Sequence, residues 1–487
     1  MFSLTQIKAV YFLGIGGIGM SALARYFIKK NIAVFGYDKV RTALCEKLET
    51  EGASIHYIED ISQIPHVFHT PSSEYLVVYT PAIPANSVEL GFFLNQGIDL
   101  QKRAQVLGMI SHNSFTIAIA GTHGKTTTSS MFATALYHAG INFTAFLGGL
   151  SVDLGSNYFD FNQGSSLVDK INFEECDFSP QLFLNTDGSP KDVVLVEADE
   201  YDRSFLSLSP SLALLTSTDA DHLDIYQEAQ GVTKGFQDFV NKILSGGALL
   251  FFETTNISKP LSIQSFSYGS SLNNDFSCHN MKYEKGDFSF DFVKNEQRFK
   301  YKLGIDGMHN AWNATAVLAA FDILGLGAEK ASLGLEKFKG VNRRFQLVFE
   351  SPNFTLIDDY AHHPTELDAI ILSVKEKYPN RKITGVFQPH LFSRTRDFLN
   401  EFAKSLSVLD ACFLLEIYPA RELPIPGVTS ALLATKIPGC KGVFSPTDFL
   451  NKMSENVPPI LLVLGAGDID LLVPSLKEIY ETANSNK

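Results

Sequence analysis

The sequence predicts an α/β protein with three domains in series, each built on a mainly parallel sheet. Three observations lead to this fold class. Short apolar strands alternate with helical stretches from the start of the chain, which is the pattern of a parallel sheet. The same alternation begins again at Phe115 and a third time after Gly340. Finally, 487 residues are too many for one core. With boundaries near 114 and 338, the expected domains are 1–114, 115–338 and 339–487.

The first domain begins with a β-α-β unit that carries the glycine-rich turn Gly14-Ile-Gly-Gly-Ile-Gly19. Glycines between a strand and a helix allow a diphosphate to approach the helix N-terminus, and Asp38 stands where such folds bind a sugar hydroxyl. We predict a nucleotide-diphosphate site, with a purely structural turn as the alternative; the pattern does not distinguish NAD from a nucleotide sugar. The expected elements are strand Val10–Leu13, helix Ser21–Lys30, strand Ala33–Tyr37, helix Leu44–Gly52 and strand Leu76–Thr80. The expected contacts are Gly14, Gly16, Gly17, Gly19 and Asp38.

The second domain opens with the most informative segment of the chain. The apolar run Phe115–Ala120 predicts a strand, and it breaks into Gly121-Thr-His-Gly-Lys-Thr-Thr-Thr128, where a helix can start. This arrangement gathers backbone N–H groups around a phosphate, with a lysine for the outer phosphates and a hydroxyl for Mg²⁺. Only two residues separate the glycines, so the loop is a shortened variant of the usual P-loop. We predict that it binds ATP or GTP; a Gly/Thr-rich turn without a ligand is the alternative. The expected contacts are Gly121, Thr122, His123, Gly124, Lys125, Thr126 and Thr127, with Thr126 on Mg²⁺.

Two acidic clusters follow later strands of this domain. Glu197-Ala-Asp-Glu-Tyr-Asp202 comes after the apolar run Val193–Val196, and Asp219-Ala-Asp-His-Leu-Asp224 comes after Leu212–Thr216. Ligands of α/β folds bind at the carboxyl ends of parallel strands, and carboxylates suit Mg²⁺. Together with the lysine loop, Glu197 and His222 therefore indicate an ATP–Mg²⁺ site. The alternative for the first cluster is a solvated acidic turn.

The rest of the second domain changes character. Short alternating segments across residues 249–305 predict antiparallel hairpins, and the alanine-rich stretch 310–323 predicts a helix. Asn310 and Asn313 open that helix and could pair with an adenine edge, although the residues alone favour a capping role for Asn310. Residues 160–191, rich in Asn, Ser, Asp, Gly and Pro, predict an exposed insertion to which we assign no chemistry.

The third domain repeats the alternation, and charged residues follow its strands. Asp359 and His363 follow the first of the expected strands, and Arg394 follows the second. Carboxylates, imidazoles and arginines at neighbouring strand ends indicate a site for an anionic substrate. Arg344, at the entry to the domain, is either a cation for phosphate or ordinary surface charge. The expected strands are Phe354–Ile357, Ile383–Phe387, Ala411–Ile417 and Ile460–Leu464.

Composition limits the classes of partner. The net charge of −13 provides no basic field for nucleic acid or an anionic membrane, and 45% hydrophobic residues with 19% charged residues are typical of a globular protein. No apolar run reaches the ~18 residues of a membrane span, and the N-terminus resembles no secretory signal. The five scattered cysteines fit reduced thiols. We expect a cytoplasmic protein with small-molecule partners, no nucleic acid partner and no membrane partner.

In their order along the chain, these motifs resemble those of the Mur ligases, and the resemblance runs from Val10 to about Asp468. Among Mur ligases, the motifs look most like those of the members that add L-alanine. The resemblance implies a Rossmann-like UDP-binding domain, a P-loop-type ATP-binding central domain and a Rossmann-like C-terminal domain. The matching segments are Gly14–Met20, Gly121–Thr128, Glu197–Asp202, Asp221-His222, His309–Asn313, Arg343–Phe345, Asp358–Pro364, Phe387–Asp397 and Pro424–Gly427.

The resemblance also implies a reaction. ATP would phosphorylate the lactyl carboxylate of UDP-N-acetylmuramate, and the amine of L-alanine would attack the acyl phosphate, which starts the peptide stem of peptidoglycan. One Mg²⁺ would be held by Thr126 and a second by Glu197 and His222. Either His222 or His363, or a carboxylate beside one of them, could act as the base. The enzyme would be a monomer or a weak homodimer. The implied catalytic residues are Lys125, His222, Asp359, His363 and Arg394, and further ATP contacts are Asn310, Asn313 and Arg344.

Two positions depart from the family's pattern. Leu391 stands where alanine-adding members commonly carry an arginine, so Arg394 or Arg396 would have to hold the substrate. Several members also carry a carbamylated lysine after the His222 motif; the nearest lysine here is Lys234, and we do not assign it that role.

Three other functions compete with this one. A murein tripeptide ligase would act on the same UDP sugar and share the motifs of the first two domains. An NAD-dependent oxidoreductase could use Gly14–Gly19, but it has no use for the second nucleotide site at Lys125. A regulator that only hydrolyses ATP would not need the charged cluster of the third domain.

Overall fold

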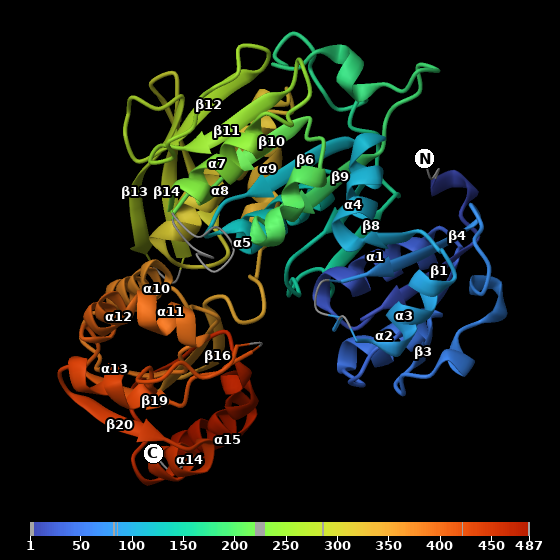
Figure 1. The fold of residues 1–487 in the computed structure, drawn as a ribbon. Coiled ribbons are helices and arrows are strands. Elements are labelled where there is room, and N and C mark those ends of the chain that lie inside the picture. Colours follow the sequence, from blue (N-terminus) through green and yellow to red (C-terminus); the bar gives the residue numbers. More distant parts are fainter. Residues whose placement is uncertain are drawn as a thin grey trace. The chain divides into compact units, whose positions relative to one another are not determined.

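The computed structural model describes residues 4–80, 83–84, 86–219, 229–284, 287–420 and 422–485. Its named strands form sheets of five, ten and six strands, and the predicted α/β architecture of three domains in series is confirmed (Figure 1). The chain divides into two units: the first holds the five-stranded sheet and most of the ten-stranded sheet, and the second holds the six-stranded sheet. Within the described ranges, no helix is long and apolar enough to cross a membrane.

The five-stranded sheet is parallel throughout, in the order β3-β2-β1-β4-β5. Its central strand β1 (Ala9–Leu13) is buried on both faces: Val10 and Phe12 enter one core, and Tyr11 and Leu13 enter another. Because both faces are covered, the strand reads as a continuous apolar run rather than an alternating one. The other elements are η1 (Leu4–Gln6), α1 (Ile18–Lys29), β2 (Ala33–Tyr37), α2 (Ala43–Glu51), β3 (Ser54–His56), η2 (Ile61–Gln63), η3 (His66–Phe68), β4 (Tyr75–Tyr79), α3 (Val88–Asn95), β5 (Leu100–Lys102) and α4 (Arg103–His112).

The ten-stranded sheet has the order β15-β14-β13-β12-β11-β10-β6-β9-β7-β8. Its strand β6 (Phe115–Ala120) lies between β10 and β9 and leads through the predicted phosphate loop into α5 (Lys125–His138). The other elements are β7 (Phe143–Phe146), β8 (Tyr158–Phe161), η4 (Pro180–Phe183), β9 (Val193–Glu197), η5 (Tyr201–Ser207), β10 (Leu212–Leu215), α7 (Ala229–Val240), β11 (Ala248–Phe252), β12 (Gln264–Gly269), β13 (Phe276–Glu284), β14 (Asp287–Lys294), β15 (Gln297–Leu303), α8 (Met308–Ile323) and α9 (Glu329–Lys337).

The expectation of antiparallel hairpins across residues 249–305 is wrong for the first part of that region. Strand β11 pairs with β12, and β12 with β13, in the parallel direction. Later in the region, β13 and β14 are neighbours, and so are β14 and β15, which are joined as a hairpin by Asn295 and Glu296, both with positive φ. Two such residues form the turn that matches the strand twist. An alternating pattern shows that one face of a strand is solvated, but it does not give the direction of the neighbouring strand.

Residues 160–191 are mostly exposed, as predicted, but the segment is not free of the core. Phe178 and Phe183 are buried, and the Phe183 ring stacks on Phe115 of strand β6 with 4.5 Å between centroids. The polar residues before and after these two anchors, such as those in 172–175 and 185–190, are mostly exposed. A few aromatic residues therefore attach the segment to the core, although its average composition resembles that of a free loop.

The six-stranded sheet has the order β16-β17-β21-β18-β19-β20, and only β16 runs antiparallel to its neighbour. Two separate cores cover its faces. Its elements are β16 (Gln346–Glu350), β17 (Thr355–Asp359), α10 (Pro364–Lys377), β18 (Ile383–Phe387), α11 (Phe392–Asp397), α12 (Leu399–Leu406), β19 (Ala411–Leu415), α13 (Ser430–Lys436), β20 (Cys440–Phe444), α14 (Pro446–Glu455), β21 (Ile460–Leu464), η6 (Asp468–Leu472) and α15 (Val473–Ser485).

Candidate active site

The glycine-rich turn lies between β1 and α1, as predicted. Gly14 has a φ of +84°, a conformation that suits glycine. The carboxylate of Asp38 accepts hydrogen bonds from the N–H of Gly16 at 2.8 Å and of Val40 at 3.1 Å. A Cβ on Gly16 would come within 2.9 Å of this carboxylate, so the glycine is what lets Asp38 hold the turn. Asp38 thus shapes the loop, and its contact with a sugar hydroxyl stays a prediction.

A cavity of about 200 Å³ lies beside the start of α1, within the first unit. Its lining includes Arg103, the first residue of α4, and two acidic residues, Glu197 at the end of β9 and Asp199 just after it. Arg103 packs against Gly19 so closely that any Cβ there would overlap the guanidinium group. Sequence reasoning missed Arg103; the available signal was a basic residue directly after a short strand. The cavity therefore has a cation near a helix N-terminus, which favours a diphosphate, and carboxylates elsewhere in its wall.

The phosphate loop is hydrogen-bonded to the segment that follows β10. Ser217 accepts a hydrogen bond at its carbonyl from Thr122 N–H (3.3 Å) and at its hydroxyl from His123 N–H (2.8 Å). Gly121 and Gly124 both have positive φ, and a Cβ on Gly124 would lie 2.9 Å from Asn313 Oδ1. The structure thus brings Asn313 of α8 to the loop, as the predicted nucleotide site requires. Thr126 and Thr127 are buried in the first turn of α5.

Lys125 is bound to a buried carboxylate. Its Nζ lies 2.9 and 2.8 Å from the two oxygens of Glu200, and it also donates to the carbonyls of Gly121 (2.5 Å) and Thr122 (3.2 Å). Burial opposes the charge on Lys125, but the surrounding carboxylates, Glu200 first, raise its pKa. Burial also raises the pKa of Glu200 to about 7, although Lys125 offsets part of that effect. The ammonium group is therefore kept charged and close to the loop carbonyls.

Glu197, the last residue of β9, faces the start of α5. Its carboxylate accepts from the Thr126 hydroxyl at 2.9 Å, from Ser129 at 3.4 Å and from Gly148 N–H at 2.9 Å. Burial raises the pKa of Glu197, and Lys125 opposes the rise. A hydroxyl beside a carboxylate fits Mg²⁺, which keeps several waters and phosphate oxygens as ligands. Among the described residues, no group of three or more His, Cys, Asp or Glu side chains is arranged to hold a metal by itself.

His222, the other predicted metal ligand, lies outside the described residues. Asn310 is the third residue of α8, so it is not the N-cap, and the capping role is wrong. Its amide instead donates to the carbonyl of Asp306 at 2.6 Å. The adenine contact of Asn310 stays a prediction.

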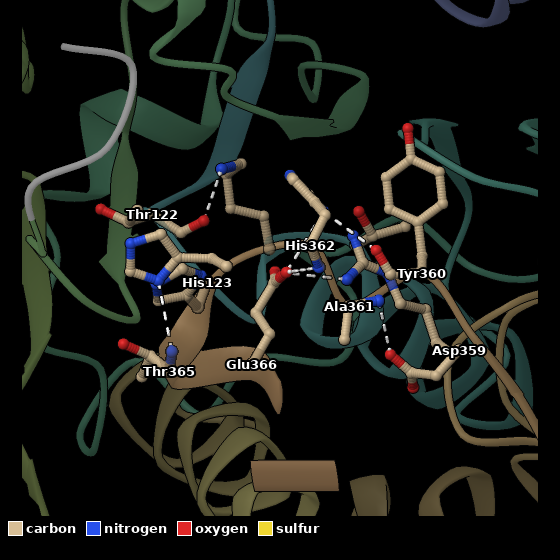
Figure 2. A network of polar contacts seen from close by, with 12 residues as sticks. Thr122, His123, Asp359, Tyr360, Ala361, His362, Thr365 and Glu366 are labelled. Atoms are coloured by element: carbon tan, nitrogen blue, oxygen red, sulfur yellow. Dashed lines mark hydrogen bonds and ion pairs between the residues drawn. The ribbon is translucent and has the colours of Figure 1, made fainter. Parts of the chain in front are cut away.

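In the six-stranded sheet, two aspartates end strand β17. Asp359 accepts hydrogen bonds from the N–H groups of Phe345 at 2.6 Å and Ala361 at 2.8 Å, the second of which is visible in Figure 2. Burial raises the pKa of Asp359 to about 6, although Arg344 opposes the shift. Burial likewise raises the pKa of Asp358 to about 7, against the effect of Arg343. These carboxyl groups therefore titrate near neutral pH, where a proton acceptor is useful.

His363 is the N-cap of α10: its Nδ1 accepts the N–H of Thr365 at 3.4 Å, and its ring packs edge-on against Phe398. Beside it, Glu366 accepts the backbone N–H of His362 at 3.0 Å (Figure 2). This hydrogen bond at the helix N-cap holds the His363 imidazole in one orientation. Its proposed part in catalysis stays a prediction.

The predicted arginines of this domain all make internal contacts, although Arg343 and Arg344 are partly exposed. Arg343 donates to Gly465 O at 2.6 Å, and the guanidinium groups of Arg343 and Arg344 both lie over the Tyr360 ring. Arg394 is 6% exposed, with Nη1 3.5 Å from His390 Nδ1. Leu391 is buried at a φ of +68°, so this position offers an apolar side chain and no cation.

Three family models match the chain. They are described as the Mur ligase family catalytic domain (residues 9–115), the Mur ligase middle domain (residues 119–321) and the Mur ligase glutamate ligase domain (residues 343–476). Together they span most of the sequence.

Whole-length relatives and solved structures agree with these matches. The chain is 41% identical to the UDP-N-acetylmuramate–L-alanine ligase of Cytophaga hutchinsonii over 98% of both chains, and 42% identical to that of Parabacteroides distasonis over 98% of both. Its fold is similar to that of the UDP-N-acetylmuramate–alanine ligase of Thermotoga maritima, with a TM-score of 0.75 and 25% identity over 98% of this chain and 100% of that one. A murein peptide ligase of Psychrobacter arcticus shares the fold at a TM-score of 0.66 and 20% identity, covering 97% of this chain and 98% of that one.

Proposed function

The chain belongs to the Mur ligase family, and we propose that it is an ATP-dependent ligase that joins L-alanine to UDP-N-acetylmuramate. The observation that carries the proposal is the cavity whose lining includes both Arg103 and Glu197. Its lining includes Gly19 of the glycine-rich turn, and its Glu197 accepts a hydrogen bond from Thr126 of the phosphate loop. An oxidoreductase would not need that second site, and a simple ATPase would not need the first.

Each domain has a separate task in this proposal. Residues 1–114 bind the UDP sugar, with Gly14, Gly16, Gly17 and Gly19 at the diphosphate and Asp38 at a sugar hydroxyl. Residues 115–338 bind ATP through Gly121–Thr127, Asn310 and Asn313, and residues 339–487 supply Asp359, His363 and Arg394 to the ligation step, with Arg344 toward ATP. The protein works in the cytoplasm as a monomer or a weak homodimer.

Lys125 has the main electrostatic task. Its ammonium group exchanges its contact with Glu200 for a phosphate oxygen of ATP, and there it neutralises charge on the group transferred to the lactyl carboxylate. Glu200 can accept a proton at this moment, because burial already raises its pKa to about 7. Thr126, Glu197 and His222 would hold Mg²⁺, which supplies further charge stabilisation when it is bound.

The amine of L-alanine must lose a proton when it attacks the acyl phosphate. Asp359, whose pKa is raised to about 6, is suited to take it, and His363 is the second candidate for this task. The carboxyl carbon then releases phosphate and keeps the new amide bond. Arg394 binds the carboxylate of the incoming amino acid, since the side chain of Leu391 carries no positive charge.

The test is phosphate release from ATP with Mg²⁺ and UDP-N-acetylmuramate, compared across L-alanine, murein tripeptide and no amine. We expect release with L-alanine and an amide product of the matching mass. Release with the tripeptide alone would move the assignment to the recycling ligase. Release that does not depend on an amine would leave an ATPase in its place.

A further inference from the structure

Two cysteines face each other across the edge of the six-stranded sheet. Cys412 of β19 and Cys440 of β20 are direct partners in the register of these parallel strands, which lie side by side in Figure 1. Neighbouring strands are separated by about 4.8 Å, and disulfides form between Cα atoms about 4.4–6.8 Å apart. The backbone spacing is therefore compatible with a bond between them.

The side chains of the pair also lie on the same face. Both belong to the apolar core that includes Leu433 and Ile437, where Cys412 is buried and Cys440 is partly buried. The hydrogen bond from the Cys412 thiol lowers the pKa of Cys440 to about 6, while burial opposes the shift. The more accessible sulfur is thus the one that is readily a thiolate, which is the reactive form.

From this placement we propose that Cys412 and Cys440 form a reversible disulfide with low-molecular-weight disulfides as the oxidant. The Cys440 thiolate attacks one sulfur of the external disulfide and releases one thiolate. The Cys412 sulfur then attacks Cys440, gives up its proton and releases the second thiolate. The two protein thiols lose two electrons, and the external disulfide is reduced to two thiols.

The cross-link would close a loop that carries part of the candidate site. Between the two cysteines, Tyr418 forms a bridge with His390, and Glu422 accepts the N–H of Ser393 at 2.9 Å. The bond would tie the edge strand β20 to β19 at the start of both strands, away from these residues. We therefore expect it to raise the thermal unfolding midpoint by several degrees, because the unfolded chain is constrained.

The test treats the full-length protein with oxidised glutathione at pH 7.5. The expected result is a fall from five free thiols to three, a Cys412–Cys440 peptide in a non-reducing digest, and a higher unfolding midpoint that a reductant reverses. A stable glutathione adduct on Cys440, or five unreacted thiols, would overturn the proposal. An unchanged unfolding midpoint in the cross-linked protein would contradict the expected stabilisation by the disulfide.

Variants separate the pair from the other cysteines. Cys412→Ser should trap one glutathione on Cys440, because the resolving thiol is gone, and Cys440→Ser should leave the buried Cys412 unmodified. Cys176→Ser is the matched control, since Cys176 is also partly buried and burial raises the pKa of its thiol. Cross-linking in this control should proceed as in the parent protein.

Discussion

Replacing Lys125 by methionine tests the centre of the proposed mechanism. Methionine keeps most of the side-chain volume but removes the cation that lies 2.8 Å from Glu200. Ligation should fall by at least about 10²–10³-fold, since a charge aimed at the reacting phosphate is lost. Binding of UDP-N-acetylmuramate should be almost unchanged, because the glycine-rich turn lies on the other sheet of the unit. Equal loss of both activities would contradict the division of tasks.

The same change has a predictable cost in stability. Glu200 is only 2% exposed, and its pKa is about 7 with Lys125 present, against 4.5 for a free glutamate. Without the cation the folded-state pKa must be higher still. A carboxyl group with a raised folded-state pKa binds more protons when folded, so stability falls as the pH rises from about 4.5 to the folded-state value. At about 1.4 kcal/mol per pH unit, the loss between pH 4.5 and pH 8 is at least about 3 kcal/mol.

Urea unfolding at pH 5.5 and pH 8 measures this loss. Lys125→Met should be less stable at pH 8 than at pH 5.5 by about 2–3.5 kcal/mol, because 2.5 pH units at about 1.4 kcal/mol each set the upper limit of the loss. Adding Glu200→Gln removes the unpaired charge, so the double variant should regain most of the stability while ligation stays lost. The reasoning is refuted if the double variant is as unstable at pH 8 as the single one.

Three further predictions address the other walls of the site. Gly148→Ala places a Cβ against the Glu197 carboxylate, so the Mg²⁺ concentration for half-maximal ligation should rise about 10-fold or more. Gly91→Ala is the control: a Cβ at Gly91 would point into open space, and the Mg²⁺ concentration should not change. Arg103→Ala should raise KM for UDP-N-acetylmuramate about 10- to 100-fold and leave KM for ATP unchanged in initial-rate assays. The pKa of Asp359 is raised from 3.8 to about 6, so ionisation of this carboxyl group lowers the free energy of unfolding as the pH rises between these values. The urea unfolding midpoints at pH 4.5 and pH 7 should therefore differ less in Asp359→Asn than in the parent protein.

The sequence predicts strands well where they are buried on both faces. Phe115–Ala120 and Val193–Val196 are apolar throughout, and each forms a strand at the predicted place. Around residues 249–305 the pattern alternates, and here the strands were found but the direction of β11, β12 and β13 was not. Strand direction depends on the connection and on the neighbouring strand, which a short window of sequence does not contain.

The site was predictable to a similar extent. Motif spacing placed the phosphate loop, and the ends of β9 and β17 carry the predicted Glu197 and Asp359. It did not identify Arg103 or the partner of Lys125, because both depend on contacts between residues far apart in the chain. Nor did it show that Asp38 and His363 also support the backbone as a loop brace and a helix cap.

The two predicted nucleotide sites are physically connected in the first unit. Asn157 is fully buried, its amide N–H₂ donates to Ile18 O (2.5 Å) and Ser21 Oγ (3.0 Å), and its oxygen accepts from Arg25 at 2.5 Å. The three partners belong to α1, directly after the glycine-rich turn.

The segment that ends at Asn157 begins beside the other site. Its Gly148 N–H donates to Glu197, and the N–H of Leu147 donates to the carbonyl of Asn157. A buried amide with all its hydrogen bonds made allows few alternative positions, since any shift leaves a polar group unpaired. The loop therefore fixes the start of α1 relative to Glu197. That is the geometric condition for a sugar carboxylate, held at its diphosphate by the first sheet, to meet a phosphoryl group bound at the second.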